Sequence, residues 1–164
     1  MSRSGSNGSK GGAIPLNDPA RGGLENYAPY LMNRIAGRYN ASLRSEMSKL
    51  GLTTAQMRSI AVLNVHDGIM IRELSVYAVV EQSTLSRALD KLEAEAMIER
   101  LPDETDNRAT RVHLTDKGRE AYHRLWPHMR TAVDRMFAGI DEDEQRAFLG
   151  TLRKMLRNVR QHDF

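Results

Sequence analysis

Residues 81–93 read EQSTLSRALDKLE, and the spacing of their apolar residues decides the fold. Those residues recur at steps of three and four, which predicts a short helix with one buried stripe. The stripe consists of Leu85, Ala88, Leu89 and Leu92. The opposite face is short, polar and partly basic, and it carries Ser83, Thr84, Ser86, Arg87, Asp90 and Lys91. We therefore expect a helix beginning near Glu81 to Ser83 whose open face can approach another polar surface closely.

A second short helix precedes this segment, and a hairpin follows it. Ile71, Leu74 and Ala78 have helical spacing, while residues 98–101 and 110–114 form two strand-like runs around the polar stretch 102–107. Two short helices joined by a tight turn and followed by a hairpin constitute a winged helix-turn-helix. In that motif the second helix fits the major groove of DNA. The predicted fold class is mainly α with a small β-hairpin wing.

Residue types on the predicted helix and wing suit DNA contacts. A helix in the groove needs short side chains near its N-terminus, plus an arginine that reaches phosphate or guanine. At the wing tip, Arg108 is the candidate for the minor groove, and Asp106 could pair with an arginine to fix the loop. Asp103 and Glu104 would repel phosphate. The predicted DNA-binding set is Thr53, Ser83, Thr84, Ser86, Arg87, Lys91, Asp106, Arg108 and Arg111.

Upstream of this core we expect a tail and two further helices. Residues 1–22 are rich in Gly and Ser and predict a disordered tail, either an uninvolved extension or an arm that tracks DNA. From Leu24 to about Leu50 apolar residues recur at helical spacing. Thr53 and Gln56 then form a capping box for a helix whose core face we expect to hold Met57, Ile60, Ala61 and Val65.

Downstream, Thr115 with Asp116 predicts the start of a long helix to about Ala138, and Asp141 with Glu144 opens a final helix. The apolar stripes of the outer helices exceed what a small winged domain can cover, which favours a homodimer. The expected organisation is a dimerisation helix at 23–50, the winged helix-turn-helix at 51–116, and a linking helix with a second dimerisation helix at 117–164.

Composition excludes several function classes. The chain has 164 residues, enough for one fold, and no cysteine, so disulfides, thiolate chemistry and zinc-cysteine sites are absent. No apolar run approaches the roughly 20 residues of a membrane helix, so we expect a cytoplasmic protein. The five histidines lack metal-ligand spacing, and no catalytic motif is present. We predict a non-enzyme without metal or cofactor.

The same stretches resemble the MarR (multiple antibiotic resistance regulator) family. Residues 81–93 resemble its recognition helix; Asp106-Asn107-Arg108-Ala109 and the stretch 112–118 (VHLTDKG) resemble its wing signature. The resemblance spans roughly residues 24–159. It implies a triangular homodimer that binds a pseudopalindromic operator in double-stranded DNA and represses transcription until a small anionic, often phenolic, ligand intervenes. Where the family often has Lys-Gly, this chain has Glu95-Ala96, so we expect the turn before Met97 to be built differently.

The resemblance also implies an effector pocket between the dimer-forming helices and the DNA-binding lobe. It would lie near Tyr30, Arg34, Arg38 and Met57, where an arginine could hold an aromatic carboxylate. Arg34 and Arg38 could equally be solvated or paired across a dimer. An alternative function is a winged-helix protein-interaction adaptor or antirepressor without DNA binding.

Overall fold

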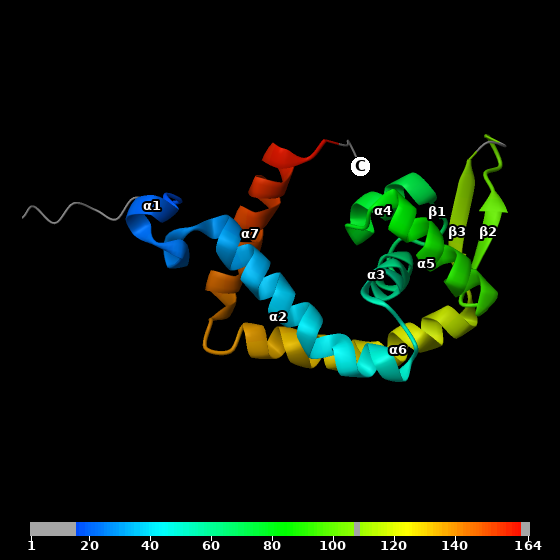
Figure 1. Cartoon of the computed structure of the whole chain (residues 1–164), viewed down its shortest axis with the longest axis horizontal. Helices are drawn as coiled ribbons and strands as arrows, with labels where there is room; N and C mark the ends of the chain where they lie inside the picture. The colour runs from blue at the N-terminus through cyan, green and yellow to red at the C-terminus, as the bar shows by residue number, and fades with distance from the viewer. Residues whose placement is uncertain (1–15, 107–108, 162–164) are drawn as a thin grey trace, which may run out of the picture. The chain divides into compact units, whose positions relative to one another are not determined.

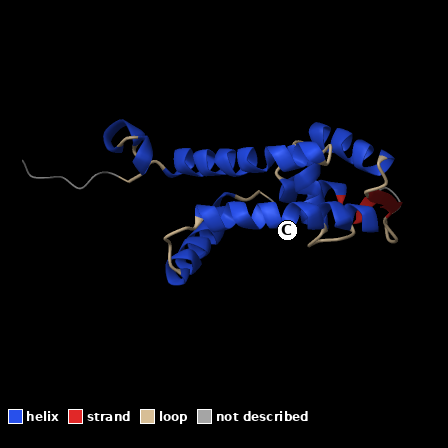
Figure 2. Ribbon diagram, turned by 90° about the horizontal axis from the view of Figure 1, so that it is seen from below, coloured by secondary structure: helices blue, strands red, loops and turns tan. Residues whose placement is uncertain are grey.

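The computed structural model describes residues 16–106 and 109–161. They form helices and one small antiparallel sheet (Figure 1), and Figure 2 shows how completely helix dominates. The chain divides into two compact units, Met1–Tyr39 and Asn40–Phe164. Among the described residues, no helix combines the length and apolarity needed to cross a membrane.

The first unit contains a helical turn where the sequence predicted only a tail. Helix α1 covers Pro19–Gly22, and the Asp18 side chain caps it by accepting a hydrogen bond from the Ala20 amide at 3.1 Å. A short 3-10 helix, η1, follows at Leu24–Asn26. The predicted tail is therefore wrong for residues 19–22, while residues 1–15 lie outside the described part of the chain.

Helix α2 spans Ala28–Lys49 and continues from the first unit into the second. It begins later than the expected Leu24 because of Pro29, whose ring lacks an amide hydrogen and clashes with a helical carbonyl four residues earlier. The start is capped from outside the helix, since the Ala28 amide donates to Asn17 Oδ1 at 3.0 Å. Helical spacing alone did not locate this boundary.

The core of the second unit is built where α2 ends and the three short helices pack. These are α3 (Thr54–Leu63), α4 (Ile71–Ala78) and α5 (Gln82–Ala94), and α3 contacts both others. The predicted capping box is confirmed, with the Thr53 hydroxyl accepting from the Gln56 amide and Gln56 Oε1 accepting from the Thr53 amide. The buried apolar residues of these four helices are Leu43, Met47, Met57, Ile60, Leu63, Leu74, Ala78, Leu85, Ala88, Leu89 and Leu92.

The prediction that Val65 lies in the core face of α3 is wrong. Val65 is 70% exposed, because the helix ends at Leu63 and Val65 belongs to the turn that follows. Gly68 follows this turn and lies at φ +72° just before the first strand.

The sheet has three strands in the order β1-β3-β2. Strands β2 (Ile98–Pro102) and β3 (Thr110–Leu114) form the predicted hairpin, with Ile98 opposite Leu114. Strand β1 (Ile69–Met70) pairs with β3 on its other side, with Ile69 opposite Val112. The sequence did not predict β1, because two residues are too few to show strand alternation.

Two long helices complete the second unit. The predicted caps are confirmed: Thr115 caps α6 (Asp116–Met136), and Asp141 caps α7 (Glu142–Val159). Helix α6 starts tightly against the turn after α5, because a Cβ on Gly118 would collide with the Met97 carbonyl. Only glycine therefore fits at this position without a shift in the backbone.

Candidate nucleic-acid interface

Helix α5 presents the open face that its sequence predicted. Its apolar stripe is fully buried, whereas Ser83, Thr84, Ser86 and Arg87 are exposed. Within residues 16–106 and 109–161, Arg87 forms no ion pair with an acidic side chain. A helix with short hydroxyl side chains and a solvated guanidinium can bring its backbone and a long donor to a DNA groove.

Two other predicted contact residues already hold structural contacts. Lys91 forms an ion pair with Glu95 at 3.8 Å and donates to the Gly51 carbonyl at 3.4 Å. Thr53 is exposed at the start of α3 but serves as its cap. Both remain near enough to solvent to meet phosphate, since the Lys91 side chain is 53% exposed.

The wing is fixed by a buried carboxylate. Asp103, 2% exposed, accepts hydrogen bonds from the Thr105 hydroxyl at 2.6 Å and from the Thr105 and Asp106 amides at 2.9 Å. The Arg111 guanidinium donates to its other oxygen. The Thr105 hydrogen bonds, with help from Arg111, lower the pKa of Asp103 far below its usual value.

This geometry changes the roles expected of Asp103 and Arg111. Asp103 faces inward and its charge is matched by Arg111, so the expectation that it repels phosphate is wrong. Arg111 also donates from Nη1 to the Gly68 carbonyl at 2.7 Å, which joins the wing to the turn before β1. The arginine that we predicted to contact DNA holds the base of the wing.

A second arginine joins the wing to α5. Arg100 on β2 reaches Glu93 Oε2 at 2.5 Å and Asp90 Oδ1 at 2.8 Å, and its own amide donates to Glu93. These contacts raise the pKa of Arg100 and, chiefly through the Arg100 hydrogen bond, lower the pKa of Glu93. The sequence pattern did not single out Arg100. The visible signal was an arginine in the strand-like run 98–101, after a helix ending in acidic residues.

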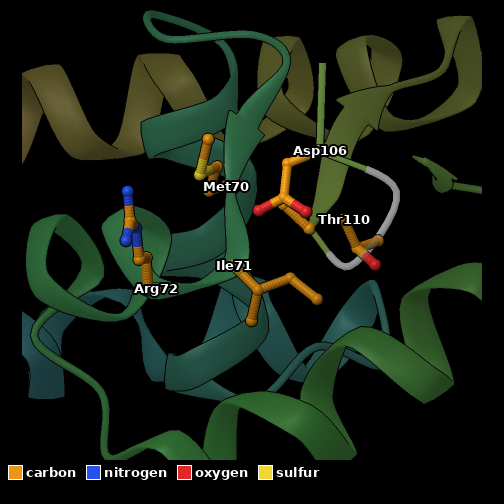
Figure 3. Close-up of a pocket in the computed structure, with 6 residues that line it drawn as sticks. Met70, Ile71, Arg72, Asp106 and Thr110 are labelled. Atoms are coloured by element: carbon orange, nitrogen blue, oxygen red, sulfur yellow. The ribbon is translucent and has the colours of Figure 1, made fainter. Parts of the chain in front are cut away.

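The wing tip borders a pocket of about 370 Å³ between the wing and the β1–α4 junction. Figure 3 shows its lining, with Asp106 and Thr110 from the wing and Met70, Ile71 and Arg72 from the junction. Asp106 is exposed there. The predicted minor-groove residue Arg108, and Asn107 before it, lie outside the described residues.

The predicted ligand residues fall into two groups. In the first unit, the Arg34 guanidinium lies 5.9 Å from the centre of the Tyr30 ring, and Arg38 is exposed one turn further along α2. Met57 lies in the second unit and is 3% exposed within its core. Met57 is therefore buried, unlike the other three residues, and its contact with a ligand stays a prediction.

The turn after α5 keeps the left-handed conformation that a glycine would give. Ala96 has φ +55°, the Ala96 amide donates to the Glu93 carbonyl, and the Met97 amide donates to the Leu92 carbonyl at 2.9 Å. The expectation that the Glu95-Ala96 pair builds a different turn is therefore wrong. Alanine occupies the strained position instead.

Two short helices, an exposed polar face on the second, and a wing fixed beside it define a winged helix-turn-helix, a DNA-binding class. A family model described as the MarR family matches residues 50–109. A crystal structure of a MarR-family transcriptional regulator from Silicibacter pomeroyi is 58% identical over 90% of this chain and 99% of that one, with a TM-score of 0.85. The chain belongs to the MarR family of transcriptional regulators.

More distant relatives agree with this assignment. The HTH-type transcriptional repressor IacR from Pseudomonas putida is 24% identical over 145 residues, which cover 88% of this chain and 86% of IacR. The fold also matches BpsR from Bordetella bronchiseptica, at 23% identity and a TM-score of 0.67 over 78% of this chain and 97% of that one. That structure concerns the regulation of BpsR DNA binding by 6-hydroxynicotinic acid.

Proposed function

We propose that this protein is a homodimeric repressor that binds a pseudopalindromic operator through α5 and the wing. The observation that carries the proposal is the open face of α5, where Ser83, Thr84, Ser86 and Arg87 are exposed beside a wing attached to the same helix through Arg100. The Asp103–Arg111 contact holds the described base of the wing in place, which reduces the ordering that this base needs when it meets DNA. The relative IacR is named a repressor, which supports repression of transcription over activation.

Exposed apolar side chains on the outer helices support the dimer. Val133 and Met136 on α6 and Leu156 and Val159 on α7 are between 37% and 72% exposed. Exposing several large apolar groups to water is unfavourable, and a second copy would cover them in a twofold arrangement. In that dimer two α5 helices would enter successive major grooves about 34 Å apart.

The test is binding of the purified protein to the DNA upstream of its own gene by fluorescence anisotropy, over a salt series and beside an unrelated duplex. We expect tight, sequence-selective binding that weakens by orders of magnitude from low to moderate salt, because phosphate contacts release counterions. Arg87→Ala and Arg108→Ala should each weaken binding strongly while the protein remains a folded dimer. Arg146→Ala is the control, since Arg146 pairs with Glu142 and Asp143 on α7.

Weak binding that is equal on both duplexes would contradict this function and favour the protein-interaction adaptor. Asp103 is buried and paired with Arg111, so it presents no free negative charge at the surface of the wing. This weakens the case for the adaptor. Normal operator binding by both arginine variants would show that other residues make the contacts.

We further propose that an aromatic carboxylate relieves repression by binding near Arg34 and Arg38, with Tyr30 beside it. The support is the exposed guanidinium pair one helical turn apart, with the Tyr30 ring 5.9 Å from Arg34. BpsR, which shares the fold, responds to a small aromatic acid. A panel of phenolic acids that includes 6-hydroxynicotinic acid should raise the melting temperature and lower operator affinity. The Arg34→Ala variant should abolish both effects, and no change across the panel would contradict the site.

A further inference from the structure

The turn that joins α4 to α5 is built on a left-handed valine. Val79 has φ +52° and ψ +54°, and the Val80 amide closes the turn by donating to the Ser75 carbonyl at 3.1 Å. Glycine takes this conformation without cost, whereas a β-branched side chain crowds the following peptide. Such a conformation persists only where the surrounding structure holds it.

The left-handed conformation of Val79 is not held by burial of its side chain, which is 76% exposed. Besides the backbone hydrogen bonds of the turn, a hydrogen bond from another helix supports it: Arg58 Nη1 on α3 donates to the Val79 carbonyl at 3.2 Å. The Arg58 guanidinium has no carboxylate partner within residues 16–106 and 109–161. Among the described residues, the polar contact of the Arg58 guanidinium is therefore the one with the Val79 carbonyl.

This contact lies where it can control the direction of α5. The Val79 carbonyl is separated from the first residue of α5, Gln82, by Val80 and Glu81 alone. Helix α3, which carries Arg58, contacts both α4 and α5. A donor on α3 that fixes this carbonyl therefore fixes the angle at which the second helix leaves the turn.

We propose that Arg58 is a positioning residue for DNA recognition, which acts by holding the left-handed Val79 turn rather than by touching DNA. The inference rests on the proposed function, in which α5 reads the operator. A positioning role and a direct phosphate contact differ in their salt dependence. Removing a phosphate contact reduces the slope of log K against log salt concentration by about one per arginine, whereas removing a positioning contact leaves that slope unchanged.

The experiment measures binding of the full-length dimer to the DNA upstream of its own gene over a potassium chloride series. Arg58→Ala should weaken operator affinity about tenfold, with an unchanged salt slope, because one hydrogen bond is lost in each subunit. Arg58→Lys retains a donor of similar reach and should recover most of the affinity. Arg146→Ala should match the wild type.

Wild-type affinity in Arg58→Ala, or a reduced salt slope, would overturn the proposal. If Arg58→Ala melts below the assay temperature, the same change is made in a Val79→Gly background, where glycine takes the left-handed conformation without strain. There Arg58→Ala should weaken affinity less than in the Val79 background, again without altering the slope, and an equal loss in both backgrounds would overturn the proposal. Absence of selective binding by the wild type would instead overturn the proposed function itself, so the two failures are distinguishable.

Discussion

Ala96 shows how a single backbone angle sets the end of α5. It lies at φ +55°, where its Cβ crowds the neighbouring carbonyl, yet the hydrogen bonds from the Ala96 and Met97 amides require this conformation. The strain is retained because it lets the chain reverse into β2 and bring Arg100 back onto α5.

Replacing Ala96 with glycine should therefore stabilise the fold. We expect Ala96→Gly to raise the free energy of unfolding by about 1 kcal/mol, because glycine relieves the left-handed strain. Ala94→Gly is the control, since Ala94 is the last helical residue of α5 and should lose up to about 1 kcal/mol. Urea denaturation measures both. Destabilisation by both changes would show that Ala96 is not strained.

Asp103 provides a prediction in pH. Its folded pKa is depressed, so its contribution to stability is complete above the unfolded pKa of about 3.9 and is lost as pH falls below that value. Asp103→Asn should lower the melting temperature at pH 7 and make the decline between pH 5 and pH 3 shallower than in the wild type. Thermal unfolding followed by circular dichroism tests this. Parallel curves for the two proteins would mean that another carboxylate governs acid unfolding.

At the scale of elements, basic side chains join the winged unit by donating to backbone carbonyls in turns. Arg111 reaches the Gly68 carbonyl at 2.7 Å, Lys117 the Glu95 carbonyl at 2.8 Å, and Arg119 the Leu114 carbonyl at 3.0 Å. Arg58 and Lys91 make similar contacts. Many basic residues that a sequence would assign to phosphate are thus committed to the fold.

The separation along the chain between contacting residues explains which features could be predicted from the sequence. The stripe of α5, the Thr53 capping box and the hairpin depend on residues close together in the chain, so local patterns revealed them. Strand β1 and the Arg111–Gly68 contact depend on segments 43 residues apart, which no local pattern reports. For the same reason the open face of α5 could be predicted from the sequence and the structural contacts of Arg111 could not, while the DNA contacts of both stay predictions.

The contact between α6 and the Met97 turn gives a prediction for Gly118. Gly118→Ala should destabilise the protein by about 2 kcal/mol, because the added Cβ overlaps the Met97 carbonyl and the start of α6 must move. Gly150→Ala is the matched control: Gly150 lies within α7 with open space at its Cβ, so alanine should stabilise by up to about 1 kcal/mol. Urea denaturation that gives equal values for the two would contradict the close packing.

At the scale of the whole molecule, the proposed operator binding depends on a dimer. Light scattering should give twice the chain mass of 18.5 kDa. Leu156→Glu, at a position 65% exposed on α7, should shift the protein to monomers and weaken operator binding, because the charge would be buried at the interface. Lys154→Glu changes charge on the same helix without removing an apolar group and should remain dimeric. A monomeric wild type would contradict the proposal.

We have proposed that two copies of α5 read successive major grooves of one operator. Hydroxyl-radical footprinting on the DNA upstream of the gene tests it most directly. We expect two related protected half-sites whose centres lie about 10 base pairs apart, one helical turn of DNA. Protection of a single half-site, or none at protein concentrations that saturate binding, would contradict it.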